Sequence, residues 1–378
     1  MGATLPAVSI APRGVLRNLA SYVPGKSIAE VKRELGLSRV VKLASNENPL
    51  GSSPRARTAY RRAAASLALY PEGTSPLLRE ALERFHRVPP GSVIIGNGSD
   101  EIIRLLCETF LGPDDEAVLS QYGFLRFRQQ AALMGARLRE VPMSHWTHDL
   151  QAMARAAGPA TKIIFVANPN NPTGTHNTAR EVEEFVRAVP PHALLVFDEA
   201  YESYARVFPS YPDSLPALVT KNPNCVVLRT FSKAHGLAAL RVGYGVARPE
   251  VIGWLDRARM PFNVSLPAQE ACIAALGDKG FVRKSVGLVN RERGPLAAAL
   301  RGRGFAVEEP SANFLFARSP LHGAELFSKL LRQGVIVRPL GEYGLEDHVR
   351  ITVGAASQNK ALVRAIDNVL AETRRRDA

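Results

Sequence analysis

The sequence predicts an α/β fold in which a mostly parallel sheet is sandwiched by helices, together with a smaller α+β domain. The large sheet is predicted because short apolar runs alternate with helical patterns between residues 92 and 166, as is typical of parallel strands covered on both faces. The smaller domain is predicted because shorter strands and helices follow residue 300. A chain of 378 residues exceeds the usual size of one core, which also favours two domains.

The composition indicates a water-soluble globular protein. Apolar residues make up 46% and charged residues 22% of the chain, and no apolar run approaches the roughly 18 residues of a membrane helix. The three cysteines, at positions 107, 225 and 272, have no paired spacing, so neither a disulfide framework nor a cysteine-based metal site is predicted. We therefore expect a cytoplasmic protein with no metal and no membrane partner.

The formal net charge of +13 raises the question of nucleic-acid binding. It arises from 48 basic and 35 acidic residues spread along the chain, apart from the basic tail at residues 374–376. No basic stripe interleaved with aromatic residues and no helix-turn-helix pattern accompanies it. A positive field also attracts small anionic ligands, and a basic solvated surface is the simplest explanation. No nucleic-acid partner is predicted.

The first half of the chain contains several predicted elements before the sheet begins. A short helix containing Ile28, Val31 and Leu35 should stop at Gly36, where a left-handed cap is favourable. A strand over residues 40–43 and helices over residues 53–69 and 76–85 are predicted next. We expect residues 1–50 to form an N-terminal arm and part of the small domain, residues 51–279 the large domain, and residues 280–378 the rest of the small domain.

A glycine turn follows the first predicted strand of the large domain. The strand over residues 92–95 leads through Gly96 and Gly98 into a helix over residues 102–111. Ser99 can cap this helix, and the free amides of its first turn form an anion site that suits a phosphate. A dinucleotide fingerprint would require glycine at position 101, where the chain has Glu101. A capped helix without a ligand remains the alternative.

Polar residues follow the ends of three later strands. The predicted strands cover residues 116–119, 137–141, 162–166, 193–197 and 225–228, with helices over residues 124–134 and 150–157 between the first of them. Because ligands collect beyond the carboxyl ends of parallel strands, we expect the following side chains to meet at one edge of the sheet: Asn171, Asp198, Tyr201 and Lys233.

These groups together fit pyridoxal phosphate, a cofactor that acts as an electron sink. Lys233 would form the imine, Asp198 would pair with the pyridinium nitrogen, and Asn171 and Tyr201 would donate to the phenolate oxygen. The phosphate would lie on the amides of the glycine turn among hydroxyl groups and an arginine. The predicted phosphate ligands are Ser99, Asp100, Thr230, Ser232 and Arg241.

Eight motifs in order make the chain resemble the fold type I aminotransferases, and within them the histidinol-phosphate aminotransferase family, along nearly its whole length. The resemblance implies a large domain with a mostly parallel sheet of the seven-stranded type. The motifs cover residues 22–26, 44–49, 70–72, 96–101, 170–174, 198–201, 232–241 and 350–354.

The resemblance also implies roles for residues whose chemistry alone is not specific. Tyr122 should stack on the cofactor ring, and Tyr70 should reach the cofactor phosphate of the neighbouring subunit in a homodimer. Arg350 should bind the substrate α-carboxylate and Arg338 the substrate phosphate, as arginine suits bidentate recognition of both groups. Two further positions, Tyr22 and Asn46, match the substrate side of the site.

The chain departs from the usual family pattern at positions that bear on substrate choice. Ser120-Gln121 replaces Pro-Thr before Tyr122, and Leu125 and His235 stand where an aromatic residue is common. The segment 264–267 also differs from the commoner version. These departures therefore bear on which substrate side chain is accepted, and not on the predicted transamination chemistry.

The predicted reaction is a ping-pong transamination between histidinol phosphate and 2-oxoglutarate through a Schiff base on Lys233. On the same scaffold, an aromatic amino acid aminotransferase and a phosphothreonine-type decarboxylase remain alternatives. A cofactor-sensing DNA-binding regulator would carry an added winged helix, which the sequence lacks. A serine-lysine hydrolase at Ser232 needs an oxyanion hole that adjacency alone does not indicate, and His145 and His148 are interpreted as surface or packing residues.

Overall fold

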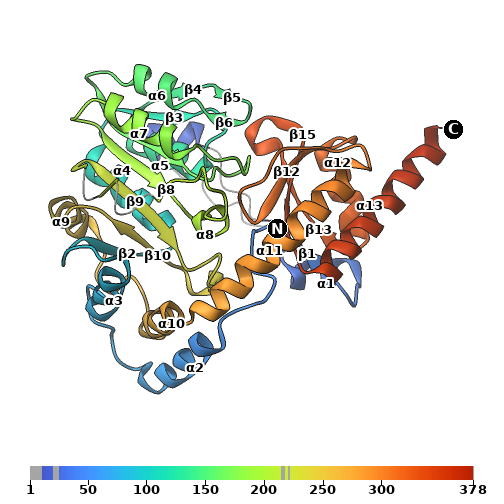
Figure 1. Cartoon of the computed structure of the whole chain (residues 1–378), viewed down its shortest axis with the longest axis horizontal. Helices are drawn as coiled ribbons and strands as arrows, with labels where there is room; N and C mark the ends of the chain where they lie inside the picture. The colour runs from blue at the N-terminus through green and yellow to red at the C-terminus, as the bar shows by residue number, and fades with distance from the viewer. Residues whose placement is uncertain (1–10, 20–24, 214–217, 220–221, 378) are drawn as a thin grey trace, which may run out of the picture.

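The computed structural model describes residues 11–19, 25–213, 218–219 and 222–377. Figure 1 shows a large α/β domain beside a smaller one, with the C-terminal helix extending away from both. The large domain contains a seven-stranded sheet. In spatial order its strands are β2 (Val93–Asn97), β10 (Val242–Val246), β9 (Cys225–Thr230), β8 (Leu194–Asp198), β7 (Thr161–Ala167), β3 (Glu116–Ser120) and β4 (Arg137–Val141).

Neighbouring strands from β9 to β4 are parallel, whereas β10 runs antiparallel to both β9 and β2. The predicted fold class, a mostly parallel sheet with a smaller α+β domain, is therefore confirmed. The carboxyl ends of β7, β8 and β9 meet at one edge, because Ala167 pairs with Asp198 and Asp198 with Leu228 in the ladder. This register is what brings polar side chains after each strand together.

Alternate residues of the strands face two separate helical layers, as the period-2 geometry of a strand requires. In β7, Ile164 and Val166 pack in one buried cluster, while Ile163 and Phe165 pack in the other. The first layer comprises α2 (Pro54–Ala63), α3 (Pro76–His86), α6 (Leu150–Ala156), α7 (Ala179–Ala188) and α10 (Leu266–Leu276). The second comprises α4 (Ser99–Phe110), α5 (Leu125–Met134) and α9 (Pro249–Ala258).

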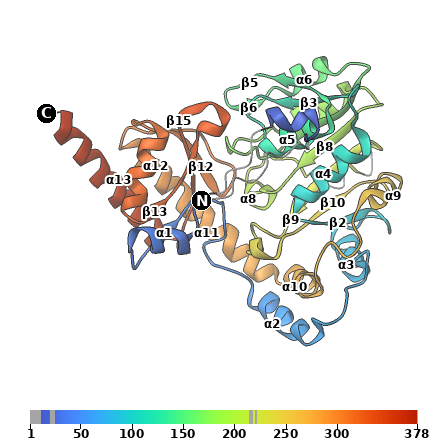
Figure 2. The ribbon, with the colours of Figure 1, turned by 180° about the vertical axis from the view of Figure 1, so that it is seen from behind.

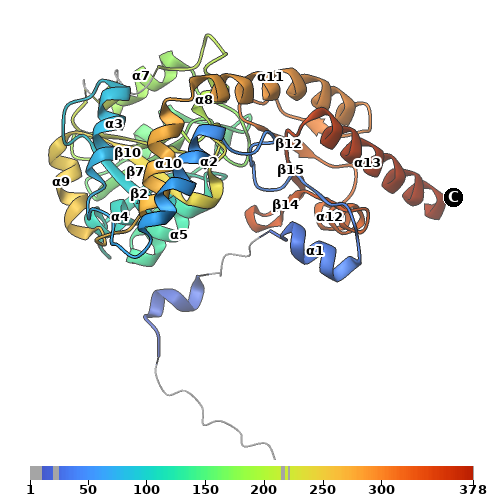
Figure 3. The same ribbon diagram turned by 90° about the horizontal axis from the view of Figure 1, so that it is seen from below.

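The small domain combines a four-stranded antiparallel sheet with a separate parallel pair of strands. The sheet contains β11 (Ala306–Val307), β12 (Phe314–Arg318), β15 (Leu345–Thr352) and β14 (Arg338–Leu340), and the pair contains β1 (Val41–Lys42) and β13 (Val335–Ile336). Its helices are α1 (Ile28–Leu35), α12 (Gly323–Arg332) and α13 (Ala356–Asp377). The 23-residue helix α11 (Lys279–Arg301) runs from the large domain along the small one (Figures 1 and 3).

N-terminal residues contribute directly to the small domain. Val41 and Leu43 lie in the same buried cluster as the C-terminal strands, and β1 pairs with β13 almost 300 residues later. Helix α1 ends as predicted, because Gly36 takes the left-handed conformation with φ 67°. The helix predicted over residues 53–69 is shorter: α2 ends at Ala63 and a 3₁₀ turn over Ala64–Ser66 follows.

Short elements complete the fold. They are the 3₁₀ turns η1 (Gly14–Asn18), η4 (Ala238–Leu240) and η5 (Gly341–Tyr343), the hairpin strands β5 (Met143–Ser144) and β6 (Thr147–His148), and α8 (Glu202–Ala205). Seen from behind, η1 lies beside α5 (Figure 2). Among the helices that the structure describes, none combines the length and the apolar character needed to cross a bilayer.

Candidate active site

A cavity of about 290 Å³ lies where the carboxyl ends of β7, β8 and β9 meet the small domain. Its wall includes residues at each of these strand ends, namely Ala167, Asp198 and Thr230. The segment after β1 and the strands β14 and β15 close it from the small-domain side. Both domains therefore contribute to one site.

Lys233 extends into this cavity from the loop after β9. Its Nζ donates a hydrogen bond of 3.2 Å to the carbonyl oxygen of Ser45 and lies 5.6 Å from the centroid of the Tyr201 ring. Among the described residues, the amine thus contacts one backbone acceptor and one ring face and forms no ion pair with a carboxylate. A lysine amine without an ion-pair partner is available to form a covalent bond with a carbonyl carbon.

Asp198 is the last residue of β8 and is only 4% exposed. Its Oδ1 accepts a 3.0 Å hydrogen bond from the backbone amide of Ala200. Burial raises the pKa of Asp198 to about 7, although the Ala200 hydrogen bond opposes this effect. A buried carboxyl group of this kind gains stability from a cationic partner, and a protonated pyridine nitrogen is such a partner. The donor set therefore fits pyridoxal phosphate.

The glycine turn between β2 and α4 forms a compact cradle beside Asp198. Gly98 has φ 74° and its amide donates a 2.8 Å hydrogen bond to the carbonyl oxygen of Arg241. A Cβ atom on Gly98 would lie 2.6 Å from Nη2 of Arg241, and one on Gly243 would lie 2.2 Å from the amide nitrogen of Ser99. The cradle thus admits no side chain at either glycine, and the start of α4 can receive an anion.

Hydroxyl groups and an arginine surround this cradle, as the sequence predicts. Thr230, Ser232 and Arg241 all line the cavity together with Ser99 and Asp100. Nη2 of Arg241 lies 3.3 Å from Oδ2 of Asp100, so the guanidinium is positioned at the helix start. The Oγ1 of Thr230 accepts a 3.1 Å hydrogen bond from the backbone amide of Ser232, which fixes the loop before Lys233.

Arg350 lies on the opposite wall, on β15. Its Nη1 donates to Oδ1 of Asn171 at 2.5 Å and its Nη2 donates to the carbonyl oxygen of Ala44 at 2.8 Å. The guanidinium carbon is 5.4 Å from the centroid of the Phe314 ring. Its buried Nε finds no hydrogen-bond acceptor within the described part of the chain. Because Arg350 lines the cavity, its guanidinium suits a carboxylate ligand.

Asn46 links the small-domain wall to Tyr201. It is 1% exposed, adopts φ 55°, and donates a 2.9 Å hydrogen bond from Nδ2 to the Tyr201 hydroxyl. Its own amide nitrogen donates to Oγ1 of Thr352 at 2.9 Å. Asn46 therefore orients the phenol that faces Lys233. The substrate-side position predicted for Asn46 lies on the cavity wall.

Arg338 lies on β14 directly opposite Arg350 in the antiparallel ladder. Both arginines line the cavity. Glu342, in the 3₁₀ turn η5, holds Arg338 through two contacts, 3.1 Å between Nε and Oε1 and 2.6 Å between Nη2 and Oε2. Glu342 was not among the residues predicted for the site, although the sequence places it four residues after Arg338.

Not every predicted residue lies on the cavity wall. The half-buried Tyr122 packs its ring 5.5 Å from that of Trp146 and is absent from the residues that line the cavity. Phe124, two residues later, provides an aromatic side chain there instead. The stacking role of Tyr122 therefore stays a prediction. Tyr22 lies outside the described residues.

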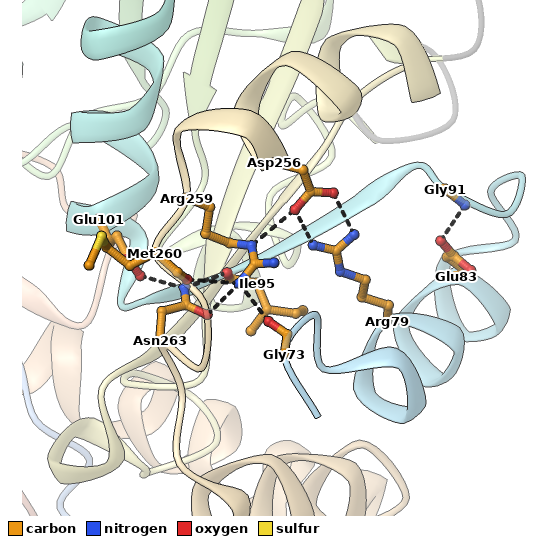
Figure 4. A network of polar contacts seen from close by, with 10 residues as sticks. All are labelled: Gly73, Arg79, Glu83, Gly91, Ile95, Glu101, Asp256, Arg259, Met260 and Asn263. Atoms are coloured by element: carbon orange, nitrogen blue, oxygen red, sulfur yellow. Dashed lines mark hydrogen bonds and ion pairs between the residues drawn. The ribbon is translucent and has the colours of Figure 1, made fainter. Parts of the chain in front are cut away.

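Tyr70 is 83% exposed, and its ring lies 4.9 Å from that of Phe262. Figure 4 shows the polar network that anchors the loop after it to the segment between α9 and α10. Arg259 donates to the carbonyl oxygen of Gly73 at 2.8 Å and contacts Asp256, which in turn accepts two hydrogen bonds from Arg79. The network therefore anchors the loop at Gly73, while Tyr70 itself stays exposed beside Phe262.

The two histidines of the β5–β6 hairpin do not form a metal site. His148 is buried, with Nδ1 2.6 Å from the hydroxyl of Ser120 and Nε2 2.9 Å from the carbonyl oxygen of Ala167. Burial lowers the pKa of His148 to about 4, whereas His145 is exposed. Within the described residues no group of three or more metal-ligating side chains occurs.

Comparisons with known proteins agree with this site. The model of the family "Aminotransferase class I and II" matches residues 38–369. A histidinol-phosphate aminotransferase of Symbiobacterium thermophilum is 45% identical over 360 residues, covering 95% of this chain and 99% of the relative. One from an Anaeromyxobacter species is 48% identical over 355 residues, covering 93% and 97%.

A crystal structure of similar shape points the same way. Histidinol-phosphate aminotransferase from Sinorhizobium meliloti, solved in complex with pyridoxal-5'-phosphate, superposes with a TM-score of 0.88 at 26% identity, covering 97% of this chain and 99% of the other. Since the motif resemblance, the cavity and these relatives agree along nearly the whole length, the chain belongs to the aminotransferase class I and II family.

Proposed function

We propose that this protein is a pyridoxal-phosphate-dependent histidinol-phosphate aminotransferase with 2-oxoglutarate as the amino acceptor. The observation that carries the proposal is the pair of cavity arginines, Arg338 and Arg350, which are cross-strand neighbours facing the lysine wall. Two guanidinium groups on one wall suit a substrate with an anionic group at each end. 2-Oxoglutarate presents a carboxylate at each end, and histidinol phosphate, whose one anionic group is its phosphate, offers oxygens that both guanidinium groups can contact.

The cofactor would be held by residues from the large domain. Lys233 would bind it covalently, Asp198 would pair with its ring nitrogen, and the start of α4 with Arg241 would hold its phosphate. Bound pyridoxal phosphate supplies an electron sink for the electron pair left when a proton leaves the substrate Cα. The pKa of Asp198, which burial raises to about 7, supports this assignment, because a cationic partner would stabilise the ionised form of the buried carboxyl.

The residues of the chain then have distinct tasks. The Lys233 amine, once released, would take the proton from the substrate Cα and return it to the neighbouring carbon of the cofactor. Arg350 would orient a substrate carboxylate, since its side chain lines the cavity. Tyr201, fixed by its hydrogen bond from Asn46, would donate to an oxygen of the cofactor ring.

Assembly and location follow from surface and core features. We infer a homodimer in which Tyr70 reaches the site of the partner, because this exposed tyrosine is held outward by Phe262 and by the network around Arg259. A cytoplasmic location is supported by the three cysteines, which are all free and buried.

The test is turnover of histidinol phosphate with 2-oxoglutarate by the purified holoenzyme, followed as L-glutamate formed. We expect a kcat/KM for histidinol phosphate at least about tenfold above that for L-phenylalanine, as an additional charged contact contributes about 1.5–3 kcal/mol. In a half-reaction, L-glutamate alone should change the absorbance of the bound cofactor. Preference for L-phenylalanine, or release of carbon dioxide from phosphothreonine, would contradict the proposal.

A further inference from the structure

The two arginines of the cavity differ in the charge of their neighbours. Arg338 and Arg350 are paired directly across β14 and β15, so their side chains leave the sheet on the same face. Like charges in this arrangement repel each other. The neighbours of each guanidinium therefore decide how much of its charge the cavity experiences.

The groups in contact with Arg350 are uncharged. They are the side-chain oxygen of Asn171, the carbonyl oxygen of Ala44 and the ring of Phe314. None of these cancels its positive charge. A substrate carboxylate at this position would meet a full cation.

Arg338 has a carboxylate partner instead. Glu342 binds it in a bidentate manner, with the Arg338 side chain 14% and the Glu342 side chain 29% exposed. The geometry arises because β14 ends at Leu340 and the 3₁₀ turn η5 immediately folds Glu342 back along the strand. Near Arg338 the wall therefore has a net charge close to zero.

This arrangement affects ligands according to their charge. A negative charge near Arg338 is attracted by the guanidinium and repelled by Glu342, and the repulsion grows in proportion to the ligand charge. Without the negative charge of Glu342, an uncharged side chain would have to desolvate a guanidinium whose charge is less compensated, which is unfavourable. Glu342 thus disfavours anionic side chains and helps the wall to accept uncharged ones.

We propose that Glu342 is a specificity-determining residue that sets how strongly the cavity prefers an anionic over an uncharged substrate side chain. The inference rests on the proposed function in one respect: the substrate side chain approaches Arg338. It does not depend on which anionic group the natural substrate carries.

The test compares two ligands that cannot be turned over, glutarate and 3-phenylpropionate. Each has a carboxylate for Arg350, but the far end is charged in glutarate and uncharged in 3-phenylpropionate. Their dissociation constants are measured by calorimetry on the wild-type holoenzyme and on Glu342→Gln, which keeps the size of the side chain. We expect the preference for glutarate to rise at least about tenfold in the variant.

Two further variants serve as controls. Glu346→Gln removes one negative charge from the nearby strand β15, at a side chain that is 60% exposed and lies 3.5 Å from His322. It should change the preference by less than about twofold, because exposed charges are screened. Glu342→Asp retains the charge and should keep the preference close to that of the wild type.

Three outcomes would overturn the inference. They are an unchanged preference in Glu342→Gln, an equal loss of affinity for both ligands, which would mean that Glu342 only holds Arg338 in place, and an equal shift in Glu346→Gln. The proposed function is judged separately, by turnover of histidinol phosphate in the wild type. Because neither test ligand contains phosphate, failure of that turnover leaves the binding comparison decisive for Glu342.

Discussion

Arg229 donates two hydrogen bonds, of 3.0 and 2.7 Å, to one carboxylate oxygen of Glu199, and the two side chains are 5% and 1% exposed. Glu199 follows Asp198, and Arg229 precedes Thr230. The ion pair thus joins the ends of β8 and β9, where the cavity begins. Burial acts to lower the pKa of Arg229, but the carboxylates of Glu202 and Glu199 raise it by more, so that the pKa lies above its ordinary value. The guanidinium therefore stays charged.

Replacing Arg229 by methionine should destabilise the fold strongly. The change leaves the Glu199 carboxylate buried without its cation, and breaking a buried pair in this way costs about 3–5 kcal/mol. The free energy of unfolding is measured by urea denaturation of the holoenzyme. Arg187→Met is the matched control, because Arg187 and its partner Glu183 are 75% and 68% exposed. A similar loss in both variants would contradict the structural role of the buried pair.

The Asp198 carboxyl predicts a specific pH dependence of stability in the cofactor-free protein. Burial raises its pKa from the ordinary 3.8 to about 7, so between these values the folded state binds more protons than the unfolded state. Its contribution to stability is therefore fully present at low pH and is lost as the pH rises through about 7. Asp198→Asn cannot ionise and should remove this loss.

The measurement is urea denaturation of cofactor-free wild type and Asp198→Asn at pH 5 and pH 8. The difference in the free energy of unfolding, variant minus wild type, should be larger at pH 8 than at pH 5. The increase should reach up to several kcal/mol, since one pKa unit corresponds to about 1.4 kcal/mol. Buried His148 and half-buried His86 and His235, whose pKa values burial lowers, act in the opposite direction. They are the same in both proteins and cancel. An equal difference at both pH values would argue against a raised pKa.

Substitutions of the two cavity arginines should affect the two substrates differently. Arg338→Ala should lower kcat/KM for histidinol phosphate about a hundredfold, because it removes a charge-assisted contact and leaves Glu342 unpaired beside the ligand. The same variant should change kcat/KM for L-phenylalanine less than about threefold. Arg350→Ala should reduce both values, because Arg350 is the cross-strand neighbour of Arg338 and would contact the phosphate of histidinol phosphate as well as the carboxylate of L-phenylalanine. Steady-state kinetics with both donors give the comparison, and equal losses in Arg338→Ala would contradict the phosphate assignment.

Much of the site was predictable because the chemistry lies at strand ends. Asn171, Asp198 and Lys233 follow consecutive parallel strands, and the ladder brings all three to one cavity. Apolar runs of four or five residues were enough to identify those strands. Helix caps such as Gly36 were predictable for the same local reason.

Features set by tertiary packing were not predictable. Strand β10 contains Gly243 and Gly245, which weaken a strand signal, yet it is inserted between β2 and β9 and brings Arg241 beside Gly98. The side-chain direction of Tyr122 depends on Trp146, which lies on a hairpin that was interpreted as a loop. The contact between Arg338 and Glu342 has helix-like spacing but occurs between a strand and a 3₁₀ turn.

Tyr70 provides the test of the proposed dimer. If Tyr70 acts in the partner's site, then Tyr70→Ala and Lys233→Ala damage the same site from different chains. Each variant alone should lose most of its activity, by at least about a hundredfold for Lys233→Ala. In a mixed dimer, one site contains both damaged residues and the other contains neither.

Mixing the two variants, after mild unfolding and refolding to exchange subunits, should therefore restore activity to roughly a quarter of the wild-type level, because about half of the dimers are mixed and each has one intact site. Arg187→Ala mixed with Lys233→Ala is the control for exchange, since exposed Arg187 lies on α7 and supplies intact Lys233 chains. That control should give roughly half of the wild-type activity. Recovery in the control but none between Tyr70→Ala and Lys233→Ala would show that Tyr70 acts in its own chain, because a mixed dimer would then contain no intact site.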